Sequence, residues 1–268
     1  VGEGLCVGGT PENCDLPPLG DAAGEGGGML SSTVILNGYL YVIGGCTNYA
    51  CSTSSGNTSY VAIGPDGALQ APAVCSGTSV GAWCVDSTNK VNGTSGVSAA
   101  GITVFNNRIY LIGGIDETAD GLRAVTHNAV NDDGSLDGAW ETNSFGGIGV
   151  AGELSYTYAY ARANPSAAST SPGNLYIIGG CSAFSNSAGC SNSYNTQVYK
   201  CNISTVGNIS GCDTSGQLQI DAELASEANQ GLGLHSGTVY ANYIYLIGGY
   251  SDNVGDRNTV FYAKFDDN

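Results

Sequence analysis

Charged residues are scarce in this chain of 268 residues, and basic residues are the scarcest of them. Only 11% of the residues are charged, and 7 lysines and arginines stand against 23 aspartates and glutamates, which gives a formal net charge of −16. So few cations cannot line a groove that follows a phosphate backbone, and they give little attraction to anionic lipid. The composition therefore disfavours nucleic acid and an anionic membrane surface as partners.

Long apolar runs are also missing. No stretch approaches the roughly 20 apolar residues that a membrane-spanning helix needs, so we expect no membrane insertion in this segment. The chain begins at Val1 and shows no signal-peptide core, which we interpret as a mature, processed product. All-β domains of this length are often single, and we expect one domain.

Common catalytic motifs are absent from the sequence. It contains neither the G-x-S-x-G turn of serine hydrolases nor the H-E-x-x-H pair of zinc peptidases. The two histidines, His127 and His235, fall in different strand positions, and we expect structural roles for both. No catalytic constellation follows from these residues, so we expect a protein that binds rather than an enzyme.

Cysteine, in contrast, is plentiful, and the ten cysteines form close neighbours around Gly-, Ser- and Asn-rich segments. The expected bridges are Cys6–Cys14, Cys46–Cys51, Cys75–Cys84, Cys181–Cys190 and Cys201–Cys212. Such spacing is typical of local disulfides, whereas zinc sites use Cys-x-x-Cys pairs or interleaved histidines. Disulfides indicate an oxidising compartment, so the protein would be secreted, periplasmic or at the cell surface. Free thiols or a metal site are the alternative.

Four N-x-S/T sequons agree with exposure outside the cell. They begin at Asn57, Asn92, Asn202 and Asn208 and are candidate glycosylation sites.

One phrase occurs four times and ends each time in two glycines. The copies are YLYVIGG at 39–45, RIYLIGG at 108–114, NLYIIGG at 174–180 and YIYLIGG at 243–249. A nearly constant interval of this kind indicates a repeat architecture.

Each repeat contains four strand-like runs. The first run is STVIL at 32–36, GITVF at 101–105 or GTVY at 237–240, and a two-residue turn joins it to the tyrosine phrase. The third copy has a longer loop with two prolines at this place. A variable loop, a third run, a turn and a fourth run follow. Four short antiparallel strands of this kind predict one blade of a β-propeller.

The repeated phrase resembles the kelch repeat. The pattern is [Leu/Ile]-Tyr-[Val/Leu/Ile]-Ile-Gly-Gly, with Val198-Tyr199 or Val260-Phe261 a dozen or so residues later, and LHSGTVYANYIYLIGG at 234–249 is the nearest copy. The resemblance covers residues 29–268 and implies a kelch-like β-propeller. The repeats are longer than usual, and the late tryptophan survives clearly only as Trp140.

The repeat spacing makes residues 1–28 equivalent to the fourth strand and outer loop of a unit. Cys6 precedes Gly44 by the same interval by which Cys75 precedes Gly113, and the last unit lacks a fourth strand. We expect residues 1–28 to complete the last blade and close a ring of four. The rival interpretation is a stretch of a longer propeller.

The loops after the glycine pairs differ most in length, and variable loops on a rigid scaffold are typical binding surfaces. The candidate ligand-binding residues there, with two outside, are Tyr49, Phe184, Tyr194, Tyr250, Arg162 and His235. In YTYAYAR at 156–162, alternation places Tyr156, Tyr158, Tyr160 and Arg162 on one face; packing between units is the alternative. Asp116, Asp120, Asp252 and Asp256 are candidates for a structural calcium ion, or simply solvated.

These observations favour an extracellular or cell-surface binding or adhesion module with a protein or glycan ligand. A structural subunit of a surface filament or layer, which would self-associate, and an extracellular carbohydrate-active enzyme are the alternatives. We expect no cofactor other than the calcium ion.

Overall fold

The computed structural model describes residues 30–48, 52–93, 95–116, 121–150, 152, 154–164, 171–181, 184–185, 189–190, 194–195, 197–214, 231–251 and 255–265. These residues form an all-β structure, and their single α-helix is the one-turn α1 (Phe145–Ile148). The all-β prediction is confirmed. No helix of the described part is long and apolar enough to cross a membrane.

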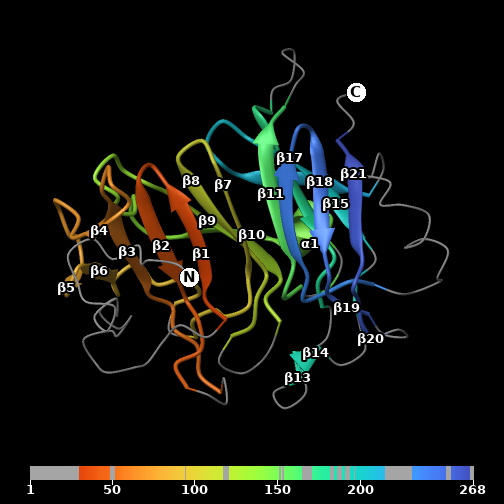
Figure 1. Ribbon diagram of the computed structural model, residues 1–268, viewed down its shortest axis with the longest axis horizontal. Helices are drawn as coiled ribbons and strands as arrows, with labels where there is room; N and C mark the ends of the chain where they lie inside the picture. Colours follow the sequence, from red (N-terminus) through yellow and green to blue (C-terminus); the bar gives the residue numbers. More distant parts are fainter. Residues whose placement is uncertain are drawn as a thin grey trace, which may run out of the picture.

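Four antiparallel sheets follow one another in chain order (Figure 1). The first has the order β1 (Ser32–Leu36), β2 (Tyr39–Ile43), β3 (Thr58–Ile63), β6 (Trp83–Asp86), β5 (Thr78–Val80), with β4 (Leu69–Gln70) also on β3. The second contains β7 (Gly101–Phe105), β8 (Arg108–Ile112), β9 (Ala124–Ala129) and β10 (Glu141–Ser144). The third contains β11 (Tyr158–Ala163), β12 (Gly173–Ile178), β15 (Val198–Ile203) and β16 (Ile209–Asp213).

The fourth sheet contains β17 (Ser236–Tyr240), β18 (Tyr243–Ile247) and β21 (Val260–Lys264). Two small hairpins lie in the loops after glycine pairs: β13 (Phe184–Ser185) with β14 (Gly189–Cys190), and β19 (Tyr250–Ser251) with β20 (Gly255–Asp256). Each of the three earlier repeats therefore forms a sheet of at least four strands, and the last forms three strands within the described residues.

The predicted two-residue turns are confirmed in three sheets. Leu36 pairs with Tyr39, Phe105 with Arg108 and Tyr240 with Tyr243. Both turn residues have positive φ in every case: Asn37-Gly38, Asn106-Asn107 and Ala241-Asn242. Positive φ at both positions is the type I′ geometry that suits the twist of paired strands. In the third sheet a longer connection replaces this turn, as the sequence indicated.

The glycine pairs bring the backbones of successive sheets into contact. All eight glycines have positive φ, between 59° and 103°. A Cβ on Gly113 would lie 1.8 Å from the carbonyl oxygen of Leu154, and the N–H of Gly114 donates to that same oxygen at 2.8 Å. Gly44-Gly45 and Gly179-Gly180 make the same contacts with Val97 and Leu232. Glycine is therefore required both for its backbone conformation and for this close approach.

A second repeated feature is a residue in the left-handed conformation before each first strand, and none of these residues is a glycine. The residue two positions before each first strand has φ between 53° and 60°, and these residues are Leu30, Ala99, Tyr156 and Leu234. The N–H of Ala99 donates to the carbonyl of Leu30, and the N–H of Tyr156 donates to that of Ala99. These bonds join the first three sheets at the start of their first strands. The sequence does not predict them, because left-handed conformations are uncommon for such residues.

Side chains pack from each sheet onto the next. Tyr41 and Ile43 of the first sheet share a core with Ile109 and Leu111 of the second. The same positions continue the pattern, with Tyr110 and Ile112 against Leu175 and Ile177, then Tyr176 and Ile178 against Ile244 and Leu246. Alternate residues of the central strands β8 and β12 thus face opposite neighbours. Each such side chain contributes about 1.5–3 kcal/mol when it is fully buried.

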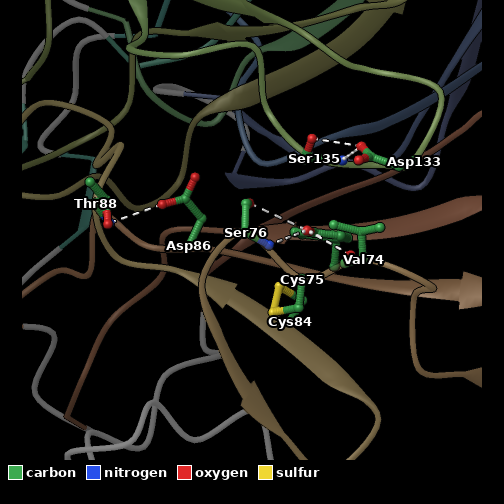
Figure 2. Close-up of a disulfide and its surroundings, with 9 residues drawn as sticks. Val74, Cys75, Ser76, Cys84, Asp86, Thr88, Asp133 and Ser135 are labelled. Carbon is green, nitrogen blue, oxygen red and sulfur yellow. Dashed lines mark hydrogen bonds between the residues drawn. A yellow bond between two sulfur atoms is a disulfide. The ribbon is translucent and has the colours of Figure 1, made fainter.

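Two of the five predicted disulfides lie wholly within the described residues and are confirmed. Cys75–Cys84 joins β6 to the segment before β5, beside Ser76 (Figure 2), and Cys201–Cys212 joins β15 to β16. Cys46 and Cys181 are disulfide-bonded too. The side chains of their predicted partners, Cys51 and Cys190, and the predicted pair Cys6–Cys14 lie outside the described part of the chain.

The described sheets do not close a ring. The first and fourth sheets lie at opposite ends of the long axis of the molecule (Figure 1), and no described strand pairs one with the other. Residues 1–28, which were expected to close the ring, lie outside the described residues. The number of blades and the closure therefore stay predictions.

Candidate functional site

An open cleft of about 360 Å³ lies between the third and fourth sheets, at the end where a tight turn joins β17 to β18. Its lining residues are Tyr160, Arg162, Val239, Tyr240, Ala241, Asn242 and Phe265. They come from β11, from the β17–β18 hairpin and from the residue that follows β21. The cleft is therefore built by segments that lie far apart in the sequence.

Arg162 is fixed in this cleft by two partners from the fourth sheet. Its guanidinium carbon lies 4.7 Å from the centre of the Phe265 ring, a cation–π distance. Its Nη1 donates a hydrogen bond to Oδ1 of Asn242 at 2.6 Å. Planar guanidinium groups present several donors in a fixed fork, so a positioned arginine suits the recognition of oxygen-rich ligands.

Aromatic rings and backbone bonds support the arginine. Tyr160 stacks on Phe265 with ring centres 5.4 Å apart, and Tyr176 packs on the same Phe265 ring with ring centres 5.0 Å apart. Phe265 is only 2% exposed, and its N–H donates to the carbonyl of Asn242 at 3.0 Å. The side chain of Asn242 donates in return to the carbonyl of Phe265 at 3.4 Å. The site is therefore attached to a packed core.

Arg162 departs from the pattern of the repeat. It is the fifth residue of β11, and the fifth residues of β1 and β7 are Leu36 and Phe105, both packed against the core. Phe105 occupies space that Gly173 leaves open, since a Cβ there would lie 2.5 Å from the ring. The equivalent residue of β17, Tyr240, is 75% exposed and lines the cleft. Arg162 therefore differs from the apolar packing of the first two sheets, and departures from a repeated pattern are expected at functional sites.

The tyrosine stretch before Arg162 alternates as predicted within β11. Tyr158, Tyr160 and Arg162 are partly buried, whereas Ala159 and Ala161 face the other side and are buried. A Cβ on Gly237 would lie 2.7 Å from the Tyr158 ring, so Tyr158 packs between the sheets. Tyr158 therefore follows the alternative expectation, packing between units, whereas Tyr160 and Arg162 line the cleft.

Three other predicted residues gather at the opposite end of the same two sheets. The rings of Tyr194 and Tyr250 lie 5.5 Å apart. A Cβ on Gly249 would lie 2.9 Å from that of His235, and a Cβ on Gly233 would lie 2.6 Å from the Tyr194 ring. The predicted ligand-binding residues of the described part therefore lie in two places: Tyr194, Tyr250 and His235 at this end of the sheets, and Arg162 in the cleft.

His235 is enclosed in that group. Both of its ring nitrogens are buried and have no hydrogen-bond partner, and burial lowers the pKa of the imidazole to about 4. A neutral, enclosed imidazole suits packing better than ligand recognition. Tyr49 and the side chain of Phe184 lie outside the described residues.

The acidic candidates do not form a described metal site. Asp116 follows the glycine pair of the second sheet and Asp256 lies in β20, while Asp120 and Asp252 are outside the described residues. No group of three or more histidines, cysteines or carboxylates able to hold a metal occurs in the described part. Calcium binding stays a prediction.

The sequons differ in exposure. Oδ1 of Asn57 is buried, whereas Asn92, Asn202 and Asn208 are exposed. Asn57 itself is partly buried, and glycosylation at the four sequons stays a prediction.

A polar cluster between the second and third sheets is structural. Nη1 of Arg108 lies 3.2 Å from Nδ1 of His127 and 3.4 Å from Oε1 of Glu141. His127 is fully buried, and burial lowers the pKa of its imidazole; burial likewise raises the pKa of Tyr110 to about 12. A fully buried histidine offers no access to a substrate.

Sequence reasoning missed Asn242, Phe265 and the cleft that they form with Arg162. The sequence indicates no binding role for them, because Asn242 is typical of a turn and Phe265 is typical of the end of a strand. Comparison with known protein families gives no match, and neither does a search of curated proteins.

Proposed function

We propose that this protein is an extracellular or cell-surface carbohydrate-binding module built as a kelch-like β-propeller. The observation that carries the proposal is Arg162, which lies on the Phe265 ring and is hydrogen-bonded to Asn242 in an open cleft of about 360 Å³. The size agrees with a small oligosaccharide, since ligand pockets are commonly about 300–1,000 Å³.

The chemistry of the lining supports a sugar ligand. The C–H faces of a pyranose ring pack on aromatic side chains such as Tyr160, and hydroxyl groups bond to guanidinium and amide groups. The net charge of −16 disfavours polyanionic glycans, so we propose a neutral oligosaccharide or one with an isolated carboxylate. The described lining contains no pair of carboxylates of the kind that glycosidases use, and we therefore propose binding without hydrolysis.

The propeller part of the proposal rests on the repeat. Successive sheets pack through the same strand positions, and the glycine pairs make the same backbone contacts three times. The two described disulfides agree with an oxidising compartment. The kelch resemblance of the Tyr-x-Ile-Gly-Gly phrase points to the same architecture.

A glycan array tests this function. The full chain, Arg162→Ala and the control Arg123→Ala are applied to neutral and uronate-containing oligosaccharides. Both variants lose one cation, but Arg123 is exposed and is not part of the cleft. We expect Arg162→Ala to weaken binding by about 10- to 100-fold, the value of hydrogen bonds from a charged donor, and Arg123→Ala to bind as wild type. Equal binding by all three proteins, or none by wild type, would contradict the proposal.

A further inference from the structure

The first strands of the four sheets, β1, β7, β11 and β17, are not equally spaced. We call the three places where successive first strands face each other the first, second and third junctions. The Cα atoms of β7 approach those of both β1 and β11 to within 8 Å along the strands, whereas β17 makes no comparable approach to β11. The cleft lies at the third junction. The wider spacing therefore occurs where the cleft opens.

Short side chains connect the strands at the first two junctions. At the first junction, the Ser32 hydroxyl of β1 donates to the carbonyl of Ala100, the residue before β7, at 2.9 Å. At the second junction, the N–H of Ala161 in β11 donates to Oγ1 of Thr103 in β7 at 3.1 Å. Each bond joins a backbone group to a hydroxyl on a Cβ, so the strand backbones must lie close together.

A tyrosine takes the place of a small residue at the third junction. Ser32, Gly101 and Tyr158 occupy the same position of the first hairpin in their sheets. Serine and glycine allow the next strand to come close, whereas tyrosine places a ring between the strands. A Cβ on Gly237 of β17 would lie 2.7 Å from the Tyr158 ring, so this ring lies directly on the backbone of β17.

Gly237 is the counterpart that makes room for the ring. Its equivalents in β7 and β11 are Ile102 and Ala159, whose side chains pack toward the preceding sheet. Gly237 is not among the glycines with positive φ, so its backbone conformation does not require glycine. A glycine within a strand often marks a close approach of another group, and here that group is the Tyr158 ring.

Longer side chains of β11 span the widened junction and line the cleft. Tyr160 stands where β7 has Thr103, and Arg162 reaches across to Asn242, with Nη1 and Oδ1 2.6 Å apart. Tyr158 itself is not among the described residues that line the cleft. It can therefore influence the cleft only through the distance that it keeps between β11 and β17.

We propose that Tyr158, packed on Gly237, is a positioning residue that holds β17 away from β11 and thereby sets the width of the cleft. Binding sites keep their working geometry when supporting residues are fixed by packing, and the ring and the glycine form such a support. A narrower cleft would bring its walls too close for a sugar ring. The part of this inference that concerns the ligand rests on the proposed function, whereas the part that concerns the spacing does not.

Crystal structures of the full chain and its variants test the spacing. Tyr158→Ser introduces the residue of the first sheet, and the Cα atoms of residues 158 and 237 should approach by about 1 Å or more, because a site relaxes partly around a deleted side chain. Gly237→Ala adds a Cβ against the ring and should move the same atoms apart. Tyr158→Phe keeps the ring and should leave the distance unchanged. Tyr158→Leu, which keeps an apolar side chain, should narrow the junction too if Tyr158→Ser does not fold.

The affinity of the same variants for the oligosaccharide that binds best on the array tests the effect on the ligand. We expect Tyr158→Ser to bind about tenfold more weakly and Tyr158→Phe to bind as wild type. An unchanged distance in Tyr158→Ser, or a shift of the same sign in Gly237→Ala, would overturn the proposal even if the sugar binds. A narrowed junction with unchanged affinity, or equal losses in Tyr158→Ser and Tyr158→Phe, would overturn its effect on binding. Absence of sugar binding by wild type would contradict the proposed function, and the crystal structures would still decide whether Tyr158 sets the spacing.

Discussion

At the scale of single residues, a comparison of two glycines distinguishes two contributions to stability: the free-energy cost of a left-handed backbone and the free-energy cost of a steric clash. Gly113 and Gly138 both have positive φ, 59° and 79°. A Cβ on Gly113 would meet the Leu154 carbonyl at 1.8 Å, whereas a Cβ on Gly138 would have no neighbour within 4 Å. The left-handed conformation alone costs about 1–2 kcal/mol for a residue with a Cβ.

We therefore expect Gly113→Ala to lower the free energy of unfolding by at least about 2 kcal/mol more than Gly138→Ala does, because the adjacent sheets must also separate. Urea denaturation of both variants and the wild type measures the difference. Equal losses would mean that the glycine pair is needed only for its φ values.

Histidine burial predicts an acid-sensitive stability. The pKa of His235 is lowered to about 4 by burial, and that of His127 is lowered for the same main reason. Each imidazole binds its proton more weakly in the folded state than in the unfolded state, where its pKa is about 6.5. The stabilisation is thus complete above pH 6.5 and is lost as the pH falls toward the folded pKa values.

We expect the free energy of unfolding to fall by up to about 3 kcal/mol between pH 7 and pH 4 from His235 alone. Denaturation at several pH values measures the slope. His235→Phe, which removes the titrating group but keeps a ring, should flatten the slope above pH 4.5, where most carboxylates remain charged. An unchanged slope in that variant would contradict the assignment to His235.

At the scale of strands and turns, the sequence predicted what is decided locally. Asparagine and glycine favour positive φ, so the turn at Asn37-Gly38 and the glycine pairs that follow the second strands could be predicted from residue type. Leu30 and Ala99 adopt the same left-handed conformation because the backbone bond between them demands it. That bond joins residues 69 positions apart, and composition gives no sign of it.

The cleft belongs to the same class of non-local features. Arg162 and Asn242 meet across 80 positions, through the packing of the third sheet on the fourth. The alternation of the tyrosine stretch predicted that Arg162 shares a face with Tyr160, but not what that face would meet. The prediction that loops after the glycine pairs carry a binding site depended on a general property of propellers and stays a prediction. The cleft lies at the opposite, turn end of the strands.

At the scale of the whole molecule, four similar sheets form an array whose two ends differ. Side chains fill the space between successive sheets, and Ile247, Val260 and Tyr262 of the fourth sheet are exposed. The proposed sugar-binding cleft lies at the junction between the last two sheets.

The most direct test of the sugar-binding proposal is NMR of the arginine side chains. The chain has only four arginines, Arg108, Arg123, Arg162 and Arg257, so their Nε–Hε signals can be assigned by substitution. The oligosaccharide that binds best on the array is titrated into the full-length protein. We predict a saturable shift of the Arg162 signal, with the other three nearly unchanged. A saturable shift of another arginine while the Arg162 signal stays constant would contradict the account.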